Sequence, residues 1–191
     1  MIKLNIPISE EDIRKLRVGD EVLLSGIIVT ARDQAHKLMV EQKPDFIRDF
    51  LKESVIYHCG PVVRKDKHGT WSFVSAGPTT SIREEPYQAD VICEYNLRGV
   101  IGKGGMGEKT SQGLQKCGAV YFHAVGGAGT LIANAVKKVI NVFNMDEFGS
   151  PEAFWVIEVK DFPLIVTMDS HGASLHKEIL EKSKKIAKEI S

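Results

Sequence analysis

Residues 76–107 read AGPTTSIREEPYQADVICEYNLRGVIGKGGMG, and they place two polar turns on either side of a predicted helix and short strand. The first turn carries Thr79, Thr80 and Arg83, and the second, which is rich in glycine, carries Lys103. Each turn therefore presents a cation beside small residues, a combination that suits the binding of a small anion. If both turns face the same pocket, they form a single binding site.

Outward from this stretch, the hydrophobic pattern alternates between strands and helices. Runs rich in β-branched and aromatic residues predict strands at 21–30, interrupted by Gly26, and at 55–60, 71–75, 99–101, 119–125, 155–159 and 162–168. Helical spacing predicts helices that begin after Ser9 and at 31–42, 44–51, 81–95, 108–116, 130–142 and 175–190. A charged turn at 65–69 predicts a hairpin tip. Interleaved strands and helices favour a single α/β layered domain, 1–191, with a mixed sheet.

The composition argues against several classes of partner. The 191 residues are 43% hydrophobic and 26% charged, as in a folded domain. Because 25 basic residues balance 25 acidic ones, we expect no nucleic-acid partner, which usually requires a basic excess. The amino-terminal segment carries charges where a signal peptide needs an apolar core, and no apolar run approaches the length of a membrane span. We therefore expect a cytoplasmic protein that makes no membrane contact.

The three cysteines, Cys59, Cys93 and Cys117, are far apart in the sequence, and no CxxC pair is present. This spacing gives no support for a metal or cluster site made by this chain alone. The odd number of cysteines also argues against a disulfide framework, which agrees with a reducing compartment. The histidines lie on separate predicted elements and show no metal-binding spacing.

The glycine turn, GKGGMG at 102–107, matches G-x-G-x-x-G between a strand and a helix. Dinucleotide binding also needs an acid about 20 residues further on, and this chain has none at that distance. A more general interpretation is an anion site made by backbone N–H groups at the helix start and by Lys103. The alternative is a tight turn whose glycines adopt positive φ, with Lys103 in solvent.

The turn at 77–83 also allows two interpretations. Its hydroxyl residues could simply cap the following helix, while Arg83 pairs with a neighbouring acid. Alternatively, the hydroxyl of Thr79 could act as a base, provided that nearby positive charge stabilises its alkoxide. Arg32, Arg83 and Lys103 supply that charge only if the fold brings them together.

Several ordered motifs together resemble the class I, iron–sulfur-dependent fumarate hydratases and the related L-tartrate dehydratases. These motifs are Ser25-Gly26, Thr30 to Asp33 with His36, Ala76 to Thr80 with Arg83, and Gly102-Lys103-Gly104. The resemblance is to the β subunit of two-subunit forms, or equally to the C-terminal domain of single-chain enzymes, and it covers most of the chain. It implies a swivelling β/β/α layered domain that closes over a cluster-bearing domain or subunit.

The resemblance also implies a reaction and its components. The family carries a [4Fe–4S] cluster held by three cysteines of the α subunit, and none of its ligands comes from the β subunit. Reversible elimination of water converts (S)-malate into fumarate, a step of the tricarboxylic acid cycle. The expected partners are a cluster-bearing α subunit, in a hetero-oligomer that allows β–β contact, and a small dicarboxylate substrate.

Carried over by position, Thr79 matches the family's catalytic threonine, which is proposed to act with an aspartate of the partner subunit. Arg32, Arg83 and Lys103 match residues that hold the substrate carboxylates. Two carboxylates need cationic, preferably bidentate, partners, and fixing both ends aligns the C–H and C–OH bonds for elimination. Supporting roles are expected for His36, which lies one helical turn from Arg32, and for Thr80, Gly102 and Gly104.

Departures from the family pattern leave the substrate open. Many single-chain fumarases resemble GPTTAGR where this chain has GPTTSIR at 77–83, and its glycine turn is closer to the two-subunit forms. Those forms include both fumarases and tartrate dehydratases. The sequence thus predicts a fumarase β subunit. The alternatives are an L-tartrate dehydratase β subunit or, more distantly, a stand-alone small-anion or nucleotide-binding module.

Overall fold

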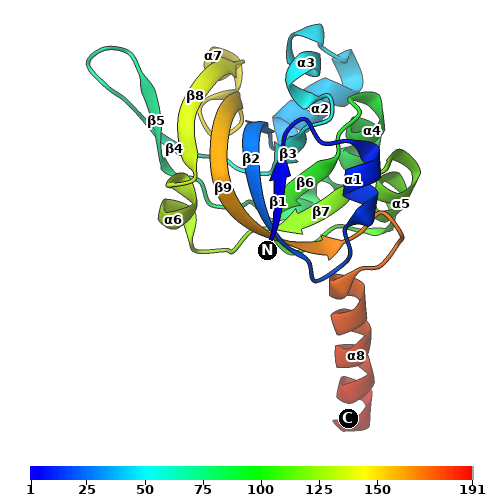
Figure 1. Cartoon of the computed structure of the whole chain (residues 1–191). Helices are drawn as coiled ribbons and strands as arrows, with labels where there is room; N and C mark the ends of the chain where they lie inside the picture. The colour runs from blue at the N-terminus through cyan, green and yellow to red at the C-terminus, as the bar shows by residue number, and fades with distance from the viewer. Residues whose placement is uncertain (191) are drawn as a thin grey trace.

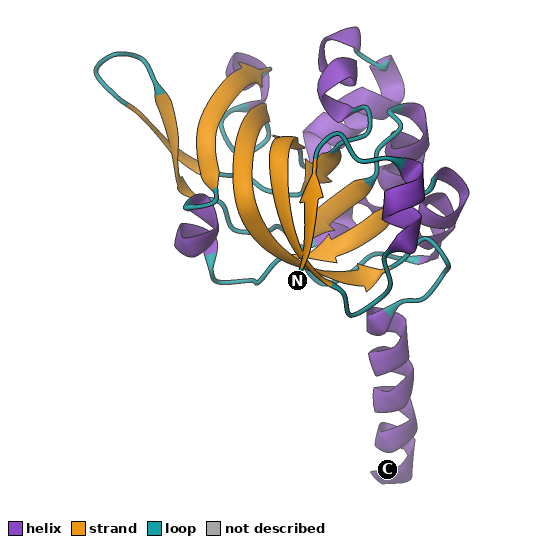
Figure 2. Ribbon diagram, in the orientation of Figure 1, coloured by secondary structure: helices purple, strands orange, loops and turns teal. Residues whose placement is uncertain are grey.

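A computed structural model describes residues 1–190 of the chain, and Figures 1 and 2 show the arrangement of its elements. The strands are β1 (Ile2–Asn5), β2 (Glu21–Thr30), β3 (Val55–Tyr57), β4 (Val62–Lys65), β5 (Trp71–Ser75), β6 (Gly99–Gly102), β7 (Val120–His123), β8 (Val136–Phe143) and β9 (Phe154–Met168). The α-helices are α1 (Glu10–Lys15), α2 (Asp33–Gln42), α3 (Arg48–Leu51), α4 (Glu85–Glu94), α5 (Glu108–Cys117), α6 (Gly129–Ala133), α7 (Met145–Phe148) and α8 (Leu175–Ile190). Two 3-10 turns, η1 (Asp45–Ile47) and η2 (Ser81–Glu84), precede α3 and α4.

Seven strands form one mixed sheet in the order β1-β2-β3-β6-β7-β9-β8. The strands β1, β2, β3, β6 and β7 are parallel to one another, whereas β9 is antiparallel to β7 and β8. The long strand β9 also pairs with β2, from Glu21↔Ile165 to Thr30↔Trp155, so the sheet curls round and closes on itself. The predicted α/β layered fold with a mixed sheet is confirmed, and the swivelling motion stays a prediction.

Alternate residues of the central strands face two different hydrophobic cores. Tyr57 and Phe122 point into the interior of the curled sheet, where the ring of Tyr57 lies 5.4 Å from that of Phe162 on β9, a strand with which β3 does not pair. Ile56 and Tyr121 point to the opposite face, on which α2, α3, α4 and α5 gather (Figure 1). Burial on both faces explains why these short strands are apolar throughout.

Two predicted elements differ from the structure at the end of the sheet. The predicted helix 130–142 is wrong, because only α6 is helical there and 136–143 form β8. This segment is rich in valine and isoleucine, whose strand preference is satisfied by pairing with β9. The predicted strands 155–159 and 162–168 are one strand, β9, which bends but does not break at Asp161, where φ is 52°.

The expectation that the chain would contain no disulfide is wrong. Cys93 of α4 and Cys117 of α5 form one, although they are 24 residues apart in the sequence. The two helices pack against each other, so the pairing follows from tertiary contact and not from spacing. Three cysteines leave one thiol, Cys59, which is free and buried.

Local signals in the sequence were more reliable. The Ser9 hydroxyl accepts a hydrogen bond of 3.1 Å from Asp12 N and caps α1, as its position before an acidic turn predicts. The hairpin tip between β4 and β5 is confirmed, and Asp66 stabilises it by accepting from His68 N and Thr70 N. Among residues 1–190, no helix combines the length and the apolar character needed to cross a membrane.

Candidate functional site

The predicted site residues lie where the parallel strands β2, β3 and β6 end. Arg32 follows β2, the turn carrying Thr79 packs beside the residues that follow β3, and Lys103 follows β6. The carboxyl ends of neighbouring parallel strands meet at one edge of a sheet, which is where open α/β folds commonly bind ligands. The fold therefore brings segments far apart in the sequence to the same edge.

The two turns that flank α4 and β6 are joined by backbone hydrogen bonds. Thr79 N donates to His58 O at 2.7 Å, and Lys103 N donates to Thr79 O at 3.3 Å. Thr80 and Lys103 thereby form an isolated parallel bridge. The two cation-bearing turns do face one another.

The side chain of Thr79 is half-buried and makes no hydrogen bond within the described residues. Thr80 occupies the N-cap position of η2 but makes no side-chain capping bond. The capping interpretation of these hydroxyls is therefore wrong. The Thr79 hydroxyl remains available to a ligand.

Arg32 and Arg83 each pair with a carboxylate of the protein, and the partner of Arg83 is Asp33, which directly follows Arg32 and begins α2. Arg83 Nη2 donates to Asp33 Oδ2, while Arg32 Nη2 lies 3.3 Å from Glu152 Oε1. The Arg32 guanidinium packs so closely on Gly60 that a Cβ there would lie 2.7 Å from Nη1. Its Nε is buried and has no hydrogen-bond partner in the described part of the chain. Arg32 thus keeps an unused donor at this edge.

Lys103 is the least engaged of the three predicted cations. Its side chain runs along Gly126, where a Cβ would lie 3.5 Å from Lys103 Cδ, and it forms no ion pair with any residue of 1–190. Positive charge at this edge is therefore only partly balanced by Asp33 and Glu152. Such an arrangement suits an anionic ligand.

Behind the turns lies a row of five buried polar side chains, which we call the buried polar chain: His36, Gln88, His58, Ser81 and Tyr121. Both imidazole Nε2 atoms face Gln88 Oε1, at 3.0 Å from His36 and 2.6 Å from His58. His58 Nδ1 and the Tyr121 hydroxyl each lie 2.8 Å from Ser81 Oγ. The buried polar chain anchors Ser81, and with it the turn that carries Thr79.

His36 does not contact the guanidinium of Arg32. Its Nδ1 lies 2.9 Å from the backbone carbonyl oxygen of Arg32, so any support that it gives is to the main chain. Burial lowers the pKa of His36 to about 4 and the pKa of His58 well below its usual value, so both rings are neutral at neutral pH. A neutral His36 must donate from Nδ1 to that carbonyl. Its Nε2 then accepts a hydrogen bond. The side-chain amide of Gln88 must therefore be turned round, so that its nitrogen takes the place of Oε1 beside the two rings.

The glycine turn is shaped by packing and backbone conformation. A Cβ at Gly102 would lie 1.8 Å from Ser81 Oγ, and Gly104 has φ of 82°, which favours glycine. A carboxylate already occupies the start of α5, because Gly107 N and Thr110 N donate to Glu85 at 2.7 and 3.2 Å. The geometry therefore does not favour an anion site on this helix start.

A family model described as "Fumarase C-terminus" matches residues 1–179. The chain belongs to this family. A protein of Geobacillus stearothermophilus, provisionally named a class I fumarate hydratase, is 52% identical over 183 residues, or 96% of this chain. The chain covers only 35% of that relative's length, so it corresponds to about a third of the longer protein.

Other relatives of this fumarase C-terminal chain match it over most of their own length. A protein of Methanocaldococcus jannaschii, provisionally named L(+)-tartrate dehydratase subunit beta, is 44% identical over 92% of this chain and 91% of its own. The L(+)-tartrate dehydratase subunit beta of Escherichia coli is 42% identical over 90% of this chain and 85% of its own. Proteins named as fumarate hydratases and proteins named as tartrate dehydratases are therefore both similar to this chain over most of its length.

The cysteines of the fumarase C-terminal chain do not fit an iron–sulfur cluster. Cys93 and Cys117 are joined to each other, and burial raises the pKa of the Cys59 thiol to about 12, which disfavours the thiolate that a metal needs. Within residues 1–190, no three histidine, cysteine or acidic side chains are grouped so as to hold a metal ion.

Sequence reasoning did not single out Glu84, Gln88 and Glu152. A partial signal exists for the first two, since they are four residues apart and share one face of a helix directly after Arg83. Nothing in the sequence points to Glu152, which reaches Arg32 only because the chain returns to β2 through β9.

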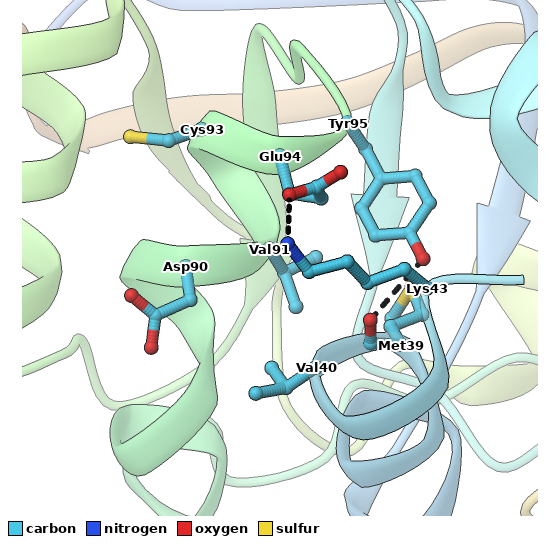
Figure 3. Close-up of a pocket in the computed structure, with 8 residues that line it drawn as sticks. All are labelled: Met39, Val40, Lys43, Asp90, Val91, Cys93, Glu94 and Tyr95. Carbon is cyan, nitrogen blue, oxygen red and sulfur yellow. Dashed lines mark hydrogen bonds and ion pairs between the residues drawn. The ribbon is translucent and has the colours of Figure 1, made fainter.

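A separate pocket of about 440 Å³ lies between α2 and α4, and none of the predicted site residues line it (Figure 3). Its charged groups are paired, Lys43 with Glu94 at 2.7 Å and Asp90 with Lys109 at 2.9 Å. The Tyr95 hydroxyl donates to Met39 O at 3.2 Å. We assign no function to this pocket, since it contains no unpaired buried polar group.

Proposed function

We propose that this chain is the β subunit of a cytoplasmic two-subunit hydro-lyase that interconverts (S)-malate and fumarate plus water. The observation that carries the proposal is that the turn with the unpaired Thr79 hydroxyl is bonded through its backbone to the turn with Lys103, at the sheet edge where Arg32 follows β2 and Arg83 pairs with Asp33. The names of the relatives, a fumarate hydratase and tartrate dehydratase β subunits, support the class of reaction and the need for a partner.

The three cations have one chemical task, to hold a dicarboxylate by both ends. Arginine donates through a planar fork, so Arg32 and Arg83 suit bidentate contact with carboxylates even while each shares a carboxylate of the protein. Lys103 adds a point charge from the opposite turn. Fixing both ends of the substrate aligns the C–H and C–OH bonds that break.

Thr79 then acts as the base that removes the proton from the carbon next to a carboxylate. A threonine alkoxide is accessible only where positive charge stabilises it, and Arg32, Arg83 and Lys103 provide that charge. The same cations stabilise the negative charge that spreads onto the carboxylate as the proton leaves.

We assign the [4Fe–4S] cluster to the partner subunit, because the cysteines of this chain do not fit it. Bound there, the cluster supplies a Lewis acid for the leaving hydroxyl. The proposed contribution of this chain is binding, orientation and proton removal.

L-tartrate is the alternative substrate, and one observation favours it. The relatives that this chain matches over most of their length are named as tartrate dehydratase β subunits, whereas the fumarate hydratase relative is much longer. Tartrate presents the same two carboxylates and one further hydroxyl, so the cations of this chain hold either substrate.

The test is reconstitution of the complete enzyme. The chain is produced with a cysteine-bearing partner, the cluster is rebuilt without oxygen, and turnover of (S)-malate and of L-tartrate is measured. We expect fumarate from malate. Turnover of tartrate alone assigns the alternative substrate. No turnover of either, together with tight nucleotide binding by the isolated chain in calorimetry, would overturn the proposal in favour of a binding module.

A further inference from the structure

Two carboxyl groups face one another beneath Arg83. Glu84, the last residue of η2, is 0% exposed, and neither of its carboxyl oxygens has a hydrogen-bond donor in residues 1–190. Asp33 Oδ1 is also buried without a donor, whereas Asp33 Oδ2 accepts from Arg83. The elements that carry them, α2 and η2, pack against each other, and each carboxyl group influences the pKa of the other. Two ionised carboxylates cannot hydrogen-bond to each other, because neither carries a proton to donate.

A single proton between the two groups satisfies both, and the surroundings decide where it resides. Burial alone would raise the pKa of Asp33, but the hydrogen bond from Glu84 and the guanidinium of Arg83 outweigh it and lower that pKa. For Glu84 the balance is reversed. Burial is the largest cause and Asp33 the second, and together they raise the pKa of Glu84 to about 8. The proton therefore resides on Glu84.

His58 is the other group that could carry this charge, and its contacts exclude it. Its Nδ1 is 4.0 Å from Glu84 Oε2, beyond hydrogen-bond range, and is directed instead at Ser81. Its Nε2 is occupied by Gln88. A protonated His58 would thus have no N–H to offer Glu84. The remaining polar neighbours are Arg83 on the same turn, Tyr121 of β7, and Arg32 through Asp33.

We propose that Glu84 is protonated in the folded protein and donates a hydrogen bond to Asp33, which holds Arg83 at the edge of the site. Glu84 is then a positioning residue that acts through Asp33 and does not touch the substrate. With Glu84 neutral, the carboxylates of residues 1–190 that pair with Arg32, Arg83 and Lys103 are Glu152, with Arg32, and Asp33, with Arg83. Ionisation of Glu84 would cancel the remaining positive charge and weaken binding of a dianion.

The first test needs no substrate. The free energy of unfolding of the isolated chain is measured against pH for the wild type, Glu84→Gln and the exposed control Glu181→Gln. Glu84 in the unfolded chain titrates near its ordinary 4.5 and in the folded chain near 8, so the folded state binds more protons between these values. Wild type and control should lose stability as pH rises through this window, and Glu84→Gln should lack that component.

The second test rests on the proposed function and uses the reconstituted enzyme. Above a pH of about 8, KM of the wild type for the dicarboxylate should rise by up to about tenfold per pH unit, because the protonated form of Glu84, which binds more tightly, becomes scarce. Glu84→Gln should keep a low KM, since its amide donates the same hydrogen bond without titrating. Glu84→Ala should raise KM at every pH.

The outcomes separate the two ideas. If the stability profiles of wild type and Glu84→Gln have the same shape, Glu84 is not protonated and the inference is overturned, whatever the enzyme does. If the profiles differ as expected but no hydratase activity is found, the proton on Glu84 stands and the proposed function fails. Glu84→Gln preserves shape and hydrogen bonding, so the test does not depend on whether Glu84→Ala folds.

Discussion

Thr79 differs from Ser81 of the same turn in having no structural task for its side chain. Its backbone N–H and carbonyl are both bonded, to His58 and Lys103, while its hydroxyl is bonded to nothing within residues 1–190. Ser81, two positions on, is the opposite, because its hydroxyl is buried between His58 and Tyr121. The same turn thus carries one hydroxyl that is free for chemistry, that of Thr79, and one that supports the structure, that of Ser81.

Thr79→Ala should lower kcat of the reconstituted enzyme by about 10²–10⁴-fold, the usual contribution of a general base. The midpoint of thermal unfolding should stay at the wild-type value, since no hydrogen bond of the fold is lost. Thr70→Ala at the exposed hairpin tip, where the bonded groups of Thr70 belong to its backbone, is the control. Near-normal turnover by Thr79→Ala would place the base elsewhere.

Gly102→Ala tests the packing behind the turns. The new Cβ would lie 1.8 Å from Ser81 Oγ and 2.9 Å from the Tyr121 hydroxyl, so the buried polar chain must shift. We expect a loss of about 1–3 kcal/mol in the free energy of unfolding, as for overpacked cores. Gly77→Ala is the matched control in denaturant titrations, because its Cβ would meet nothing closer than 3.7 Å. Equal stability of the two variants would contradict the packing argument.

At the scale of elements, α4 and α5 stabilise each other's ends. Glu85 opens α4, and its carboxylate accepts from the N–H groups of Gly107 and Thr110 and from the Thr110 hydroxyl at the start of α5. A carboxylate at a helix N-terminus satisfies unpaired N–H groups and interacts favourably with the helix dipole. The disulfide between Cys93 and Cys117 joins the other ends of the same two helices. The glycine turn between β6 and α5 is therefore held by a neighbouring helix.

Glu85→Ala should lower the free energy of unfolding by about 0.5–2 kcal/mol, the range for loss of a helix cap. Glu108→Ala is the control within the first turn of α5, because Glu108 is exposed and its only ion pair within residues 1–190 is a 3.8 Å contact with Lys177 at the surface. We expect that control to cost less than about 1 kcal/mol. Denaturant titrations measure the free energy of unfolding of both variants. A smaller loss for Glu85→Ala than for Glu108→Ala would contradict the assignment of Glu85 as a cap.

At the scale of the whole molecule, apolar side chains lie exposed beside the polar site. Ile82, Val125 and Leu131 are 52%, 61% and 73% exposed. Ile82 is next to Arg83, and Val125 precedes Gly126, along which Lys103 runs. Exposed apolar groups around a polar centre are typical of a protein interface. They fit the proposal that a second subunit closes over this edge.

Val125→Glu and Leu131→Glu should therefore reduce assembly with the partner by at least about tenfold, since a buried unpaired charge is costly at an interface. Both variants should unfold like the wild type. Ile2→Glu is the control, because Ile2 is 39% exposed and lies at the amino end of β1, at the edge opposite the site. Co-purification and size-exclusion chromatography report assembly, and unchanged assembly of both variants would remove this face as the interface.

Patterns local in sequence predicted most of the elements and supplied most of the residues proposed for the site. Alternation of strands and helices indicated the layered fold, and the turns carrying Thr79, Arg83 and Lys103 were recognisable because glycine, hydroxyl and cationic residues are close in the chain. Arg32 was singled out as a possible source of positive charge after a strand, and its role in holding a carboxylate came only from the resemblance to a family.

What depends on distant contacts was decided by the tertiary structure alone. Pairing with β9 turned 136–143 into a strand, and pairing of β9 with β2 closed the sheet. Packing of α4 on α5 joined Cys93 to Cys117 and brought the Glu85 carboxylate to the N–H groups at the start of α5. The carboxyl pair of Asp33 and Glu84 arose in the same way. The physical reason is that burial and opposed charge exist only after folding, so no local pattern records which acid keeps its proton.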